Sequence, residues 1–473
     1  MHAERHEPGV RQDGLRCTLS TSKRLSTALL FVAALFSGAA AAESIGMTPK
    51  LDAVPQPAEA TSFKPDPNLV ALGKRVFFDA RLSEPQGTSC AACHDPGRAF
   101  APTLKGEALR IGVPAGSRPG HVAARNAPSL LYLRYIPRRY FFQDDDASFP
   151  SPFGGFFADG RADSIPEQIR GPLFNPDEMG NRSPRTLQRK VAGTDLGEAL
   201  TKQFGADAVR DPERLVNGLG KALEAYFQSD ELAPFTSRFD DFLRKRTPLS
   251  AAEMRGLALF RNPDKGNCAS CHLMVESSSR PERSLFMDFG YDAIAVPRNP
   301  LLPANRDARH FDVGLCQTAR QLKWPEPDQW CGYFRTAGLR NVAVRQTFMH
   351  NGVFRTLRDT VAFYATRSTD PAQWYPGTKG TPLRFNDVPA RYQGNINVNA
   401  VPMNRRPGTP PALSEDEIDD IVAFLRTLTD ARYVALMPDP AADKARSAQA
   451  AQGAGTYGKH AVTTSSHPSA QSH

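Results

Sequence analysis

The sequence predicts a mainly α-helical, loop-rich protein built from two similar halves. Its 473 residues exceed what one hydrophobic core usually serves, so two domains are expected. The 40 prolines and 35 glycines indicate many loops and short helices. A weak internal repeat places Gly73-Lys-Arg-Val-Phe77 in the first half and Gly256-Leu-Ala-Leu-Phe260 in the second. We therefore expect domains at residues 43–240 and 241–437, followed by a disordered tail at 438–473.

The N-terminus has the pattern of an export signal. Lys23 and Arg24 precede an apolar run over residues 25–36, and small residues up to Ala42 form a cleavage-site pattern. The sequence thus predicts a signal peptide over residues 1–42 and a periplasmic mature protein. An uncleaved anchor is the alternative, but the run is short for a membrane span and no longer apolar run follows it.

The composition is that of an ordinary soluble globular protein, with 40% hydrophobic and 23% charged residues. The formal net charge is +8, but the chain contains no dense Lys/Arg run and no basic stretch interleaved with aromatic residues. Nucleic acid is therefore not expected as a partner.

Four of the seven cysteines form two copies of one motif. These are Cys90-Ala-Ala-Cys93-His94 and Cys268-Ala-Ser-Cys271-His272. Cys-x-x-Cys-His is the attachment signature of c-type haem, because the two thiols add to the porphyrin vinyl groups and the adjacent His reaches the iron. Zinc ribbons and thioredoxin-like redox pairs are the alternatives, but neither requires a His directly after each of two Cys pairs. The motifs predict two covalently bound haem c groups, with His94 and His272 as iron ligands.

Helical segments flank both motifs. Ser250 and Glu253 form a capping-box pattern at the start of the second repeat segment. Candidate closing helices lie at 212–229 and 415–428, and the latter has its apolar residues on one face. Each half is therefore expected to be cytochrome c-like, with a helix, the motif and a closing helix, and residues 230–249 would link the halves.

Three cysteines lie outside the motifs. Cys17 falls in the signal peptide, which leaves Cys316 and Cys331 as a pair. An oxidising compartment favours a disulfide between them. For a loop of this size such a bond contributes roughly 3 kcal/mol.

Residues from about 64 to 430 resemble the bacterial di-haem cytochrome c peroxidases and their relative MauG. The segments that carry the resemblance lie in family order around both motifs: Leu72-Gly-Lys-Arg-Val-Phe-Phe-Asp79, Arg125-Asn-Ala-Pro128, Asp159-Gly-Arg161, Gly171-Pro-Leu-Phe-Asn-Pro-Asp-Glu-Met179, Leu339-Arg-Asn341 and Met349-His-Asn-Gly352. The match is specific for the family and not for one member's substrate.

The resemblance implies a division of labour between the two haems. The N-terminal haem would react with peroxide, and the C-terminal haem would store or relay an oxidising equivalent. By motif position Glu178 would be the acid/base that moves the peroxide proton, with Gln168 as a polar neighbour. Burial beside the haem would raise the pKa of Glu178 towards neutrality. The alternative is that Glu178 is a solvated loop carboxylate.

Two positions depart from the peroxidase pattern. Tyr364 stands where peroxidase members have a Met ligand to the second iron, as it does in MauG-type members. A phenolate stabilises oxidised iron over Fe(II), whereas a thioether does the reverse. Met349 is the rival ligand, and Tyr364 could instead simply pack on its helix face. Ala158 stands where the family usually has a Trp that relays electrons, so a relay through this position is in doubt.

The resemblance also implies two weaker sites. Asn126 matches the side-chain ligand of a Ca²⁺ between the domains, and backbone carbonyls near Arg345 and Thr347 would complete that site. The family's usual Thr and Pro at those two positions are absent. His121 lies in the region that caps the first iron in switchable peroxidases, but it is out of register, which favours a solvated loop His.

Three functions fit these expectations. The first is a peroxidase that reduces hydrogen peroxide with electrons from a small periplasmic cytochrome c or cupredoxin. The second is a MauG-like enzyme that uses peroxide to oxidise a partner protein. The third is a non-enzymatic two-haem electron carrier, which Glu178 and Gln168 oppose, because a pure carrier needs no acid/base. We therefore expect a peroxide-dependent di-haem oxidoreductase.

Overall fold

The computed structural model describes residues 64–143, 150–277, 279–281, 284–375, 377 and 383–452. The predicted signal peptide at 1–42 lies outside these residues. Helices dominate the described part of the chain, and its strands form two short antiparallel ribbons. The predicted mainly α, loop-rich class is confirmed. Within the described ranges, no helix combines the length and the apolar character that crossing a membrane requires.

In the first half, α1 (Pro67–Phe78) packs against α9 (Pro212–Phe227). Asp66 caps α1, since its side chain accepts from the backbone N–H of Asn68 at 2.9 Å. The two helices cross at Gly73, where a Cβ atom would lie 1.9 Å from the carbonyl oxygen of Ala222. Only glycine allows this approach, which is why the repeat carries glycine here.

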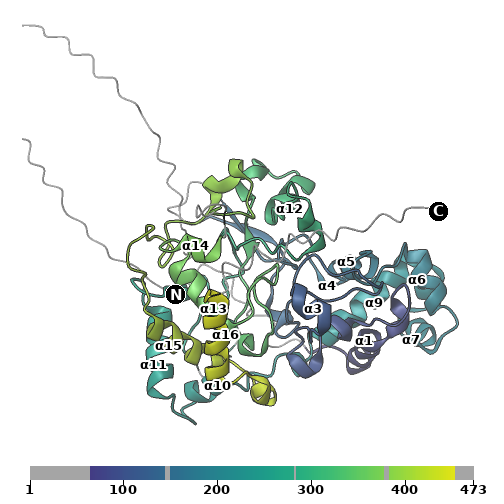
Figure 1. Cartoon of the computed structure of the whole chain (residues 1–473). Helices are drawn as coiled ribbons and strands as arrows, with labels where there is room; N and C mark the ends of the chain where they lie inside the picture. Colours follow the sequence, from purple (N-terminus) through teal and green to yellow (C-terminus); the bar gives the residue numbers. More distant parts are fainter. Residues whose placement is uncertain are drawn as a thin grey trace, which may run out of the picture. The chain divides into compact units, whose positions relative to one another are not determined.

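The second half repeats this crossing. Here α11 (Ala251–Arg261) packs against α15 (Glu415–Arg426), and a Cβ on Gly256 would lie 1.9 Å from the carbonyl oxygen of Asp420. Capping boxes at Ser250 and Ser414 start the two helices. The weak sequence repeat therefore corresponds to one helix crossing built twice, and the predicted closing helices are confirmed. In Figure 1, α1 and α9 lie on the right and α11 and α15 on the left.

The remaining helices and strands surround these two crossings. The helices are α2 (Cys90–Cys93), α3 (Gly106–Ile111), α4 (Ile165–Gln168), α5 (Arg170–Phe174), α6 (Pro184–Val191), α7 (Asp195–Phe204), α8 (Asp207–Arg210), α10 (Arg238–Leu243), α12 (Leu315–Gln321), α13 (Leu357–Thr366), α14 (Pro371–Trp374) and α16 (Pro440–Gln452). One ribbon pairs β1 (Tyr140–Phe142) with β2 (Ser151–Phe153), and the other pairs β3 (Tyr291–Asp292) with β4 (Phe334–Arg335).

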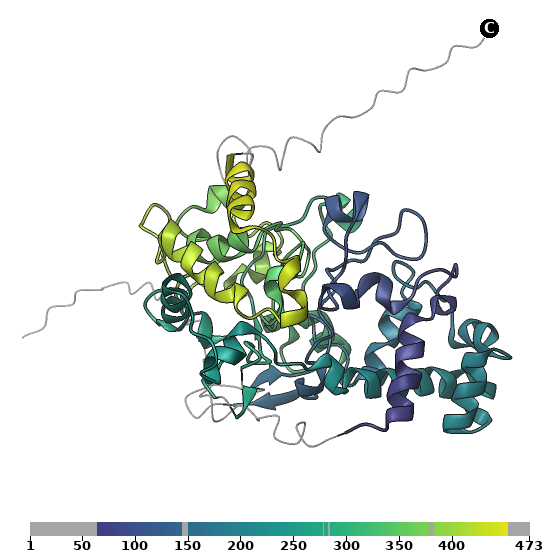
Figure 2. The same cartoon turned by 90° about the horizontal axis from the view of Figure 1, so that it is seen from below.

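Two large hydrophobic clusters fill the interior. One is built mainly from residues between 72 and 235, and the other from residues between 239 and 428. The first cluster also takes in Leu285, Val344 and Tyr433 from the later part of the chain. Figure 2 shows purple α1 on the right and the yellow-green helices of the second half on the left. The domain boundary near residue 240 stays a prediction.

The expectation of a disordered tail from residue 438 is wrong for α16. Asp439 caps this helix by accepting from the backbone of Ala441 at 2.9 Å. The helix packs on α13, where the hydroxyl of Ser447 donates to the carboxylate of Asp359. Lys444 of α16 also pairs with Asp419 of α15 at 2.6 Å. The alanine-rich sequence has high helix propensity but too few apolar residues to show a periodic pattern. Residues 453–473 lie outside the described residues.

Candidate active site

A cavity of about 1040 Å³ connects the two Cys-x-x-Cys-His motifs. Its wall contains the two cysteines and the histidine of each motif. It also contains the other residues predicted from the sequence: His121, Asn126, Ala158, Gln168, Glu178, Met349 and Tyr364. Residues that lie far apart in the chain thus line one cavity.

In the first motif, α2 places both thiols on the cavity wall, and neither Cys90 nor Cys93 forms a disulfide. Nδ1 of His94 lies 3.0 Å from the carbonyl oxygen of Pro128 and 3.3 Å from that of Phe100. Burial lowers the pKa of His94 to about 4, so the ring is neutral. Because carbonyls only accept, Nδ1 carries the proton, and the lone pair lies on Nε2.

The second motif has the same arrangement. The backbone N–H of His272 donates to the carbonyl of Cys268 at 2.8 Å, and Nδ1 of His272 lies 2.9 Å from the carbonyl of Phe286. Burial lowers the pKa of His272 as well. Cys268 and Cys271 form no disulfide and line the same cavity. Both motifs therefore offer two unpaired thiols and one oriented, neutral imidazole, the donor set that covalent haem requires.

Glu178 lies in the loop that follows α5, on the part of the wall near Cys93. Oε1 of Glu178 accepts from the side-chain amide of Asn175 at 2.7 Å. Burial raises the pKa of Glu178 despite that hydrogen bond. Gln168, the last residue of α4, lines the same cavity. The structure thus places a desolvated carboxylate and a polar amide on the wall that the first motif also lines.

Tyr364 projects from α13 into the cavity near the second motif. Burial raises the pKa of its hydroxyl, and Cys271 and Cys268 are among the groups that act on it. Met349, the rival ligand, also lines the cavity and has a left-handed backbone conformation with φ 67°. The choice between the two ligands remains a prediction.

The segment around Ala158 pairs with β4. The backbone N–H of Arg335 donates to the carbonyl of Ala158 at 2.8 Å, and its Nε donates to the carbonyl of Phe157 at 3.1 Å. The guanidinium of Arg161 lies 3.5 Å above the ring of Phe157. Phe157 and Ala158 both line the cavity, so the aromatic side chain here belongs to Phe157, the residue before Ala158.

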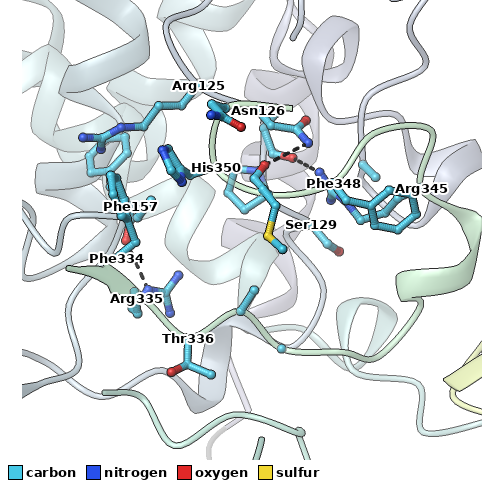
Figure 3. A pocket seen from close by; sticks show the side chains of 18 of the residues that line it. Arg125, Asn126, Ser129, Phe157, Phe334, Arg335, Thr336, Arg345, Phe348 and His350 are labelled. Atoms are coloured by element: carbon cyan, nitrogen blue, oxygen red, sulfur yellow. Dashed lines mark hydrogen bonds between the residues drawn. The ribbon is translucent and has the colours of Figure 1, made fainter. Parts of the chain in front are cut away.

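The structure adds an aromatic stack that the sequence reasoning missed. The rings of Phe334 and His350 are stacked, with centroids 3.7 Å apart and planes inclined by 12° (Figure 3). Arg125 lies 5.5 Å from the Phe334 ring and pairs with Asp159 and Asp312 at 2.7 Å each. The sequence indicated part of this network, because Arg125 lies in the Arg-Asn-Ala-Pro segment and Asp159 in the Asp-Gly-Arg segment. The partners Asp312 and Phe334 carry no sequence signal.

His121 lies in a loop that contacts the backbone of Glu178. Its Nδ1 pairs with Oδ1 of Asp177 at 2.7 Å, and both side chains are nearly half exposed. The backbone N–H of Ser117 donates to the carbonyl of Glu178 at 2.7 Å. His121 is thus a partly exposed loop residue that pairs with a carboxylate at the cavity edge.

The residues around Asn126 do not fit a calcium ion. Its amide nitrogen, rather than its oxygen, is directed at the carbonyl of Thr347, at 3.1 Å. The guanidinium of Arg345 donates to the same carbonyl from Nε at 3.3 Å and to the carbonyl of Ala127 at 2.8 Å. Figure 3 shows Asn126 and Arg345 beside each other.

Cys316 and Cys331 are joined by a disulfide, with their Cα atoms 4.6 Å apart. The bond links α12 to the loop before β4, and both cysteines are fully buried.

Comparison with known proteins identifies the family. Residues 67–248 match the family model described as di-haem cytochrome c peroxidase. The methylamine utilization protein MauG of Paracoccus denitrificans is 33% identical over 407 residues, which cover 84% of this chain and 96% of MauG. The cytochrome c551 peroxidase of Pseudomonas aeruginosa is 27% identical over 62% of this chain and 70% of its own length.

Solved structures agree with this assignment. The crystal structure of the diheme peroxidase BthA from Burkholderia thailandensis is 66% identical, with a TM-score of 0.77 over 80% of this chain and 91% of BthA. A variant of BthA with a tyrosine replaced by methionine is 67% identical, with a TM-score of 0.79 over 81% of this chain and 91% of that one. The chain therefore belongs to the di-haem cytochrome c peroxidase family, and it is a di-haem peroxidase with two covalently bound haem c groups.

Proposed function

We propose that this chain is a periplasmic enzyme that reduces hydrogen peroxide, with Glu178 as its acid/base. The haem attached through Cys90 and Cys93 would be the peroxide site. The haem attached through Cys268 and Cys271 would store or relay an oxidising equivalent. The shared cavity supports this arrangement, because both sets of thiols line it.

The chain's own residues would hold the two haems through Nε2 of His94 and of His272. Haem iron supplies the redox chemistry. The carbonyls of Pro128 and Phe286 hold the two imidazoles in the tautomer that leaves Nε2 free. On the second haem we propose Tyr364 as the further ligand.

The single observation that carries the proposal is the buried carboxylate of Glu178 on the wall near Cys93. Overall, hydrogen peroxide takes up two electrons and two protons and gives two molecules of water. Glu178 would accept a proton from one peroxide oxygen and return it to the other, so that the departing oxygen leaves as water. Its raised pKa suits a group that must both take and give a proton. Gln168 would orient the peroxide by hydrogen bonding.

The electron source distinguishes two candidate activities. Relatives named cytochrome-c peroxidase support a small periplasmic cytochrome c, or a cupredoxin, as a one-electron donor used twice. The likeness to MauG and the position of Tyr364 support a partner protein that is itself oxidised by two electrons. The relatives are enzymes, so a non-enzymatic electron carrier is set aside.

Peroxide turnover by the purified holoenzyme tests the role of Glu178. Glu178→Gln keeps the shape of the side chain but removes the proton acceptor, so turnover should fall by roughly 10²-fold or more. Glu198→Gln makes the same change at an exposed position on α7 and should leave turnover unchanged. Near-normal turnover in Glu178→Gln, with both haems present, would assign the acid/base role to another residue.

A further inference from the structure

Arg345 is a buried cation that has no anionic partner among the residues that the structure describes. It lies on the cavity wall, just after the turn at 342–344. None of the ion pairs in the described part of the chain involves it, and its hydrogen bonds go to backbone carbonyls. Burial lowers its pKa to about 10, so it stays charged at neutral pH. A charged group in this setting requires a structural or functional reason.

The guanidinium of Arg345 bridges two segments far apart in the sequence. Its Nη2 donates to the carbonyl of Ala127 at 2.8 Å, and its Nε donates to the carbonyl of Thr347 at 3.3 Å. Asn126 joins the same cluster through the Thr347 carbonyl, at 3.1 Å. These neutral oxygens are the kind that a calcium ion takes from loops. Here N–H donors already occupy the Thr347 oxygen.

A calcium ion at this place would be opposed by charge and by orientation. Nε of Arg345 and Nδ2 of Asn126 both donate to the carbonyl oxygen of Thr347, at 3.3 and 3.1 Å. Oδ1 of Asn126 is buried without a hydrogen-bond partner in the described structure. Bringing Oδ1 to a shared cation would require the amide to turn. The divalent ion would then lie beside the fixed charge of Arg345, with no carboxylate of the cluster to offset the repulsion.

We propose that the guanidinium of Arg345 takes the place of calcium in this enzyme, ties residues 125–129 to residues 345–349, and positions His94. The link to His94 is short, because Ala127 accepts from Arg345 and the next carbonyl, that of Pro128, lies 3.0 Å from Nδ1 of His94. The positioning of His94 rests on its proposed role as an iron ligand. The replacement of calcium does not depend on that role of His94.

Metal analysis tests the first part on wild-type holoenzyme. The protein is incubated with excess calcium chloride, desalted with or without EGTA, and analysed for calcium by inductively coupled plasma mass spectrometry. We expect far less than one calcium per chain, and the same melting temperature and ferric spectrum with and without EGTA. One calcium per chain that EGTA removes, with a lower melting temperature, would overturn the proposal whether or not the enzyme turns over peroxide.

Variants of Arg345 test the second part. Arg345→Gln removes a positive charge near His94, so the reduction potential of the N-terminal haem should fall in a reductive titration, and the melting temperature should fall too. Arg309→Gln removes an arginine whose side chain is 91% exposed and should change neither. An unchanged potential in Arg345→Gln contradicts the positioning role.

Arg345→Lys covers the case in which Arg345→Gln does not fold. It keeps the charge but not the planar fork that reaches two carbonyls at once. It should remain free of calcium and lose melting temperature, because the Ala127 contact is lost. Stoichiometric calcium in Arg345→Lys, or a melting temperature equal to that of the wild type, would contradict the proposal.

Discussion

The side-chain amide of Asn175 donates a 2.7 Å hydrogen bond to Oε1 of Glu178, within one turn of the same loop. Oδ1 of Asn175 accepts from the backbone N–H of Asp177 at 3.0 Å, which determines how the amide is oriented. Burial raises the pKa of Glu178 and the hydrogen bond from Asn175 lowers it, and burial has the larger effect. The hydrogen bond from Asn175 is thus the largest of the effects that oppose burial in setting the pKa of Glu178, ahead of the positive charge of Arg161.

This balance predicts the pH dependence of peroxide turnover. Because the ionised form of Glu178 accepts the first proton, kcat/KM should fall as the pH drops through its raised pKa, which lies above the ordinary value of 4.5. Asn175→Asp keeps the acceptor for Asp177 but replaces the amide donor with a like charge. Its acid limb should move to higher pH by about one unit or more. An unmoved limb, or one that persists in Glu178→Gln, would contradict this account.

The two motifs predict the mass of the mature protein. Each motif supplies both thiols for one haem, so denaturing mass spectrometry should show the polypeptide plus two haem masses. Replacing Cys268 and Cys271 together by Ala should leave one haem, and so should replacing Cys90 and Cys93. Expression must use a host competent for cytochrome c maturation. Wild-type protein with one haem or none in such a host would contradict the assignment.

The sequence predicted those parts of the fold and site that depend on local patterns. The flanking helices follow from apolar periodicity and from capping boxes such as Ser250 with Glu253, which act within one turn. The motif residues follow from the fixed spacing that haem attachment imposes. The buried environment expected for Glu178 came with the family motif, because desolvation itself depends on side chains from elsewhere in the chain.

The sequence did not predict the features that depend on contacts between residues far apart in the chain. Helix α16 has no apolar period, and contacts from Ser447 to Asp359 and from Lys444 to Asp419 dock it on the rest of the chain. Arg345 was expected near a calcium site only as a source of a carbonyl ligand. Its role as a donor depends on where the Ala127 carbonyl lies, 218 residues away in sequence. Neither relationship leaves a pattern in a single sequence.

The repeated helix crossing predicts a stability difference between two glycines. Gly256→Ala would place a Cβ 1.9 Å from the carbonyl oxygen of Asp420 and force α11 and α15 apart. Overpacking of this kind costs roughly 1–3 kcal/mol, more than the gain of up to about 1 kcal/mol in helix propensity. Gly394→Ala is the control, since a Cβ there has nothing within 4 Å. Thermal unfolding followed by far-UV circular dichroism should show a loss only for Gly256→Ala, and equal melting temperatures for the two variants would contradict the crossing.

The ligand of the second haem predicts how the enzyme starts its reaction with peroxide. A phenolate from Tyr364 is a hard, anionic ligand that stabilises Fe(III), so Fe(II) at this haem is hard to reach. The as-isolated ferric enzyme should therefore consume peroxide without prior reduction. Tyr364→Met should raise the reduction potential of the second haem by on the order of 0.1 V or more in a spectroelectrochemical titration, because axial ligands set haem potentials over a wide range.

Met349 provides the matched test of this assignment. Met349→Leu keeps the size of a side chain that also lines the cavity, but it removes the thioether. If Tyr364 is the ligand, Met349→Leu should leave the ferric spectrum of the second haem unchanged, whereas Tyr364→Phe should alter it. A spectrum that changes in Met349→Leu and not in Tyr364→Phe would assign the iron to Met349. In that case Fe(II) becomes accessible at the second haem, and the ferric enzyme should stay inert to peroxide until it is reduced.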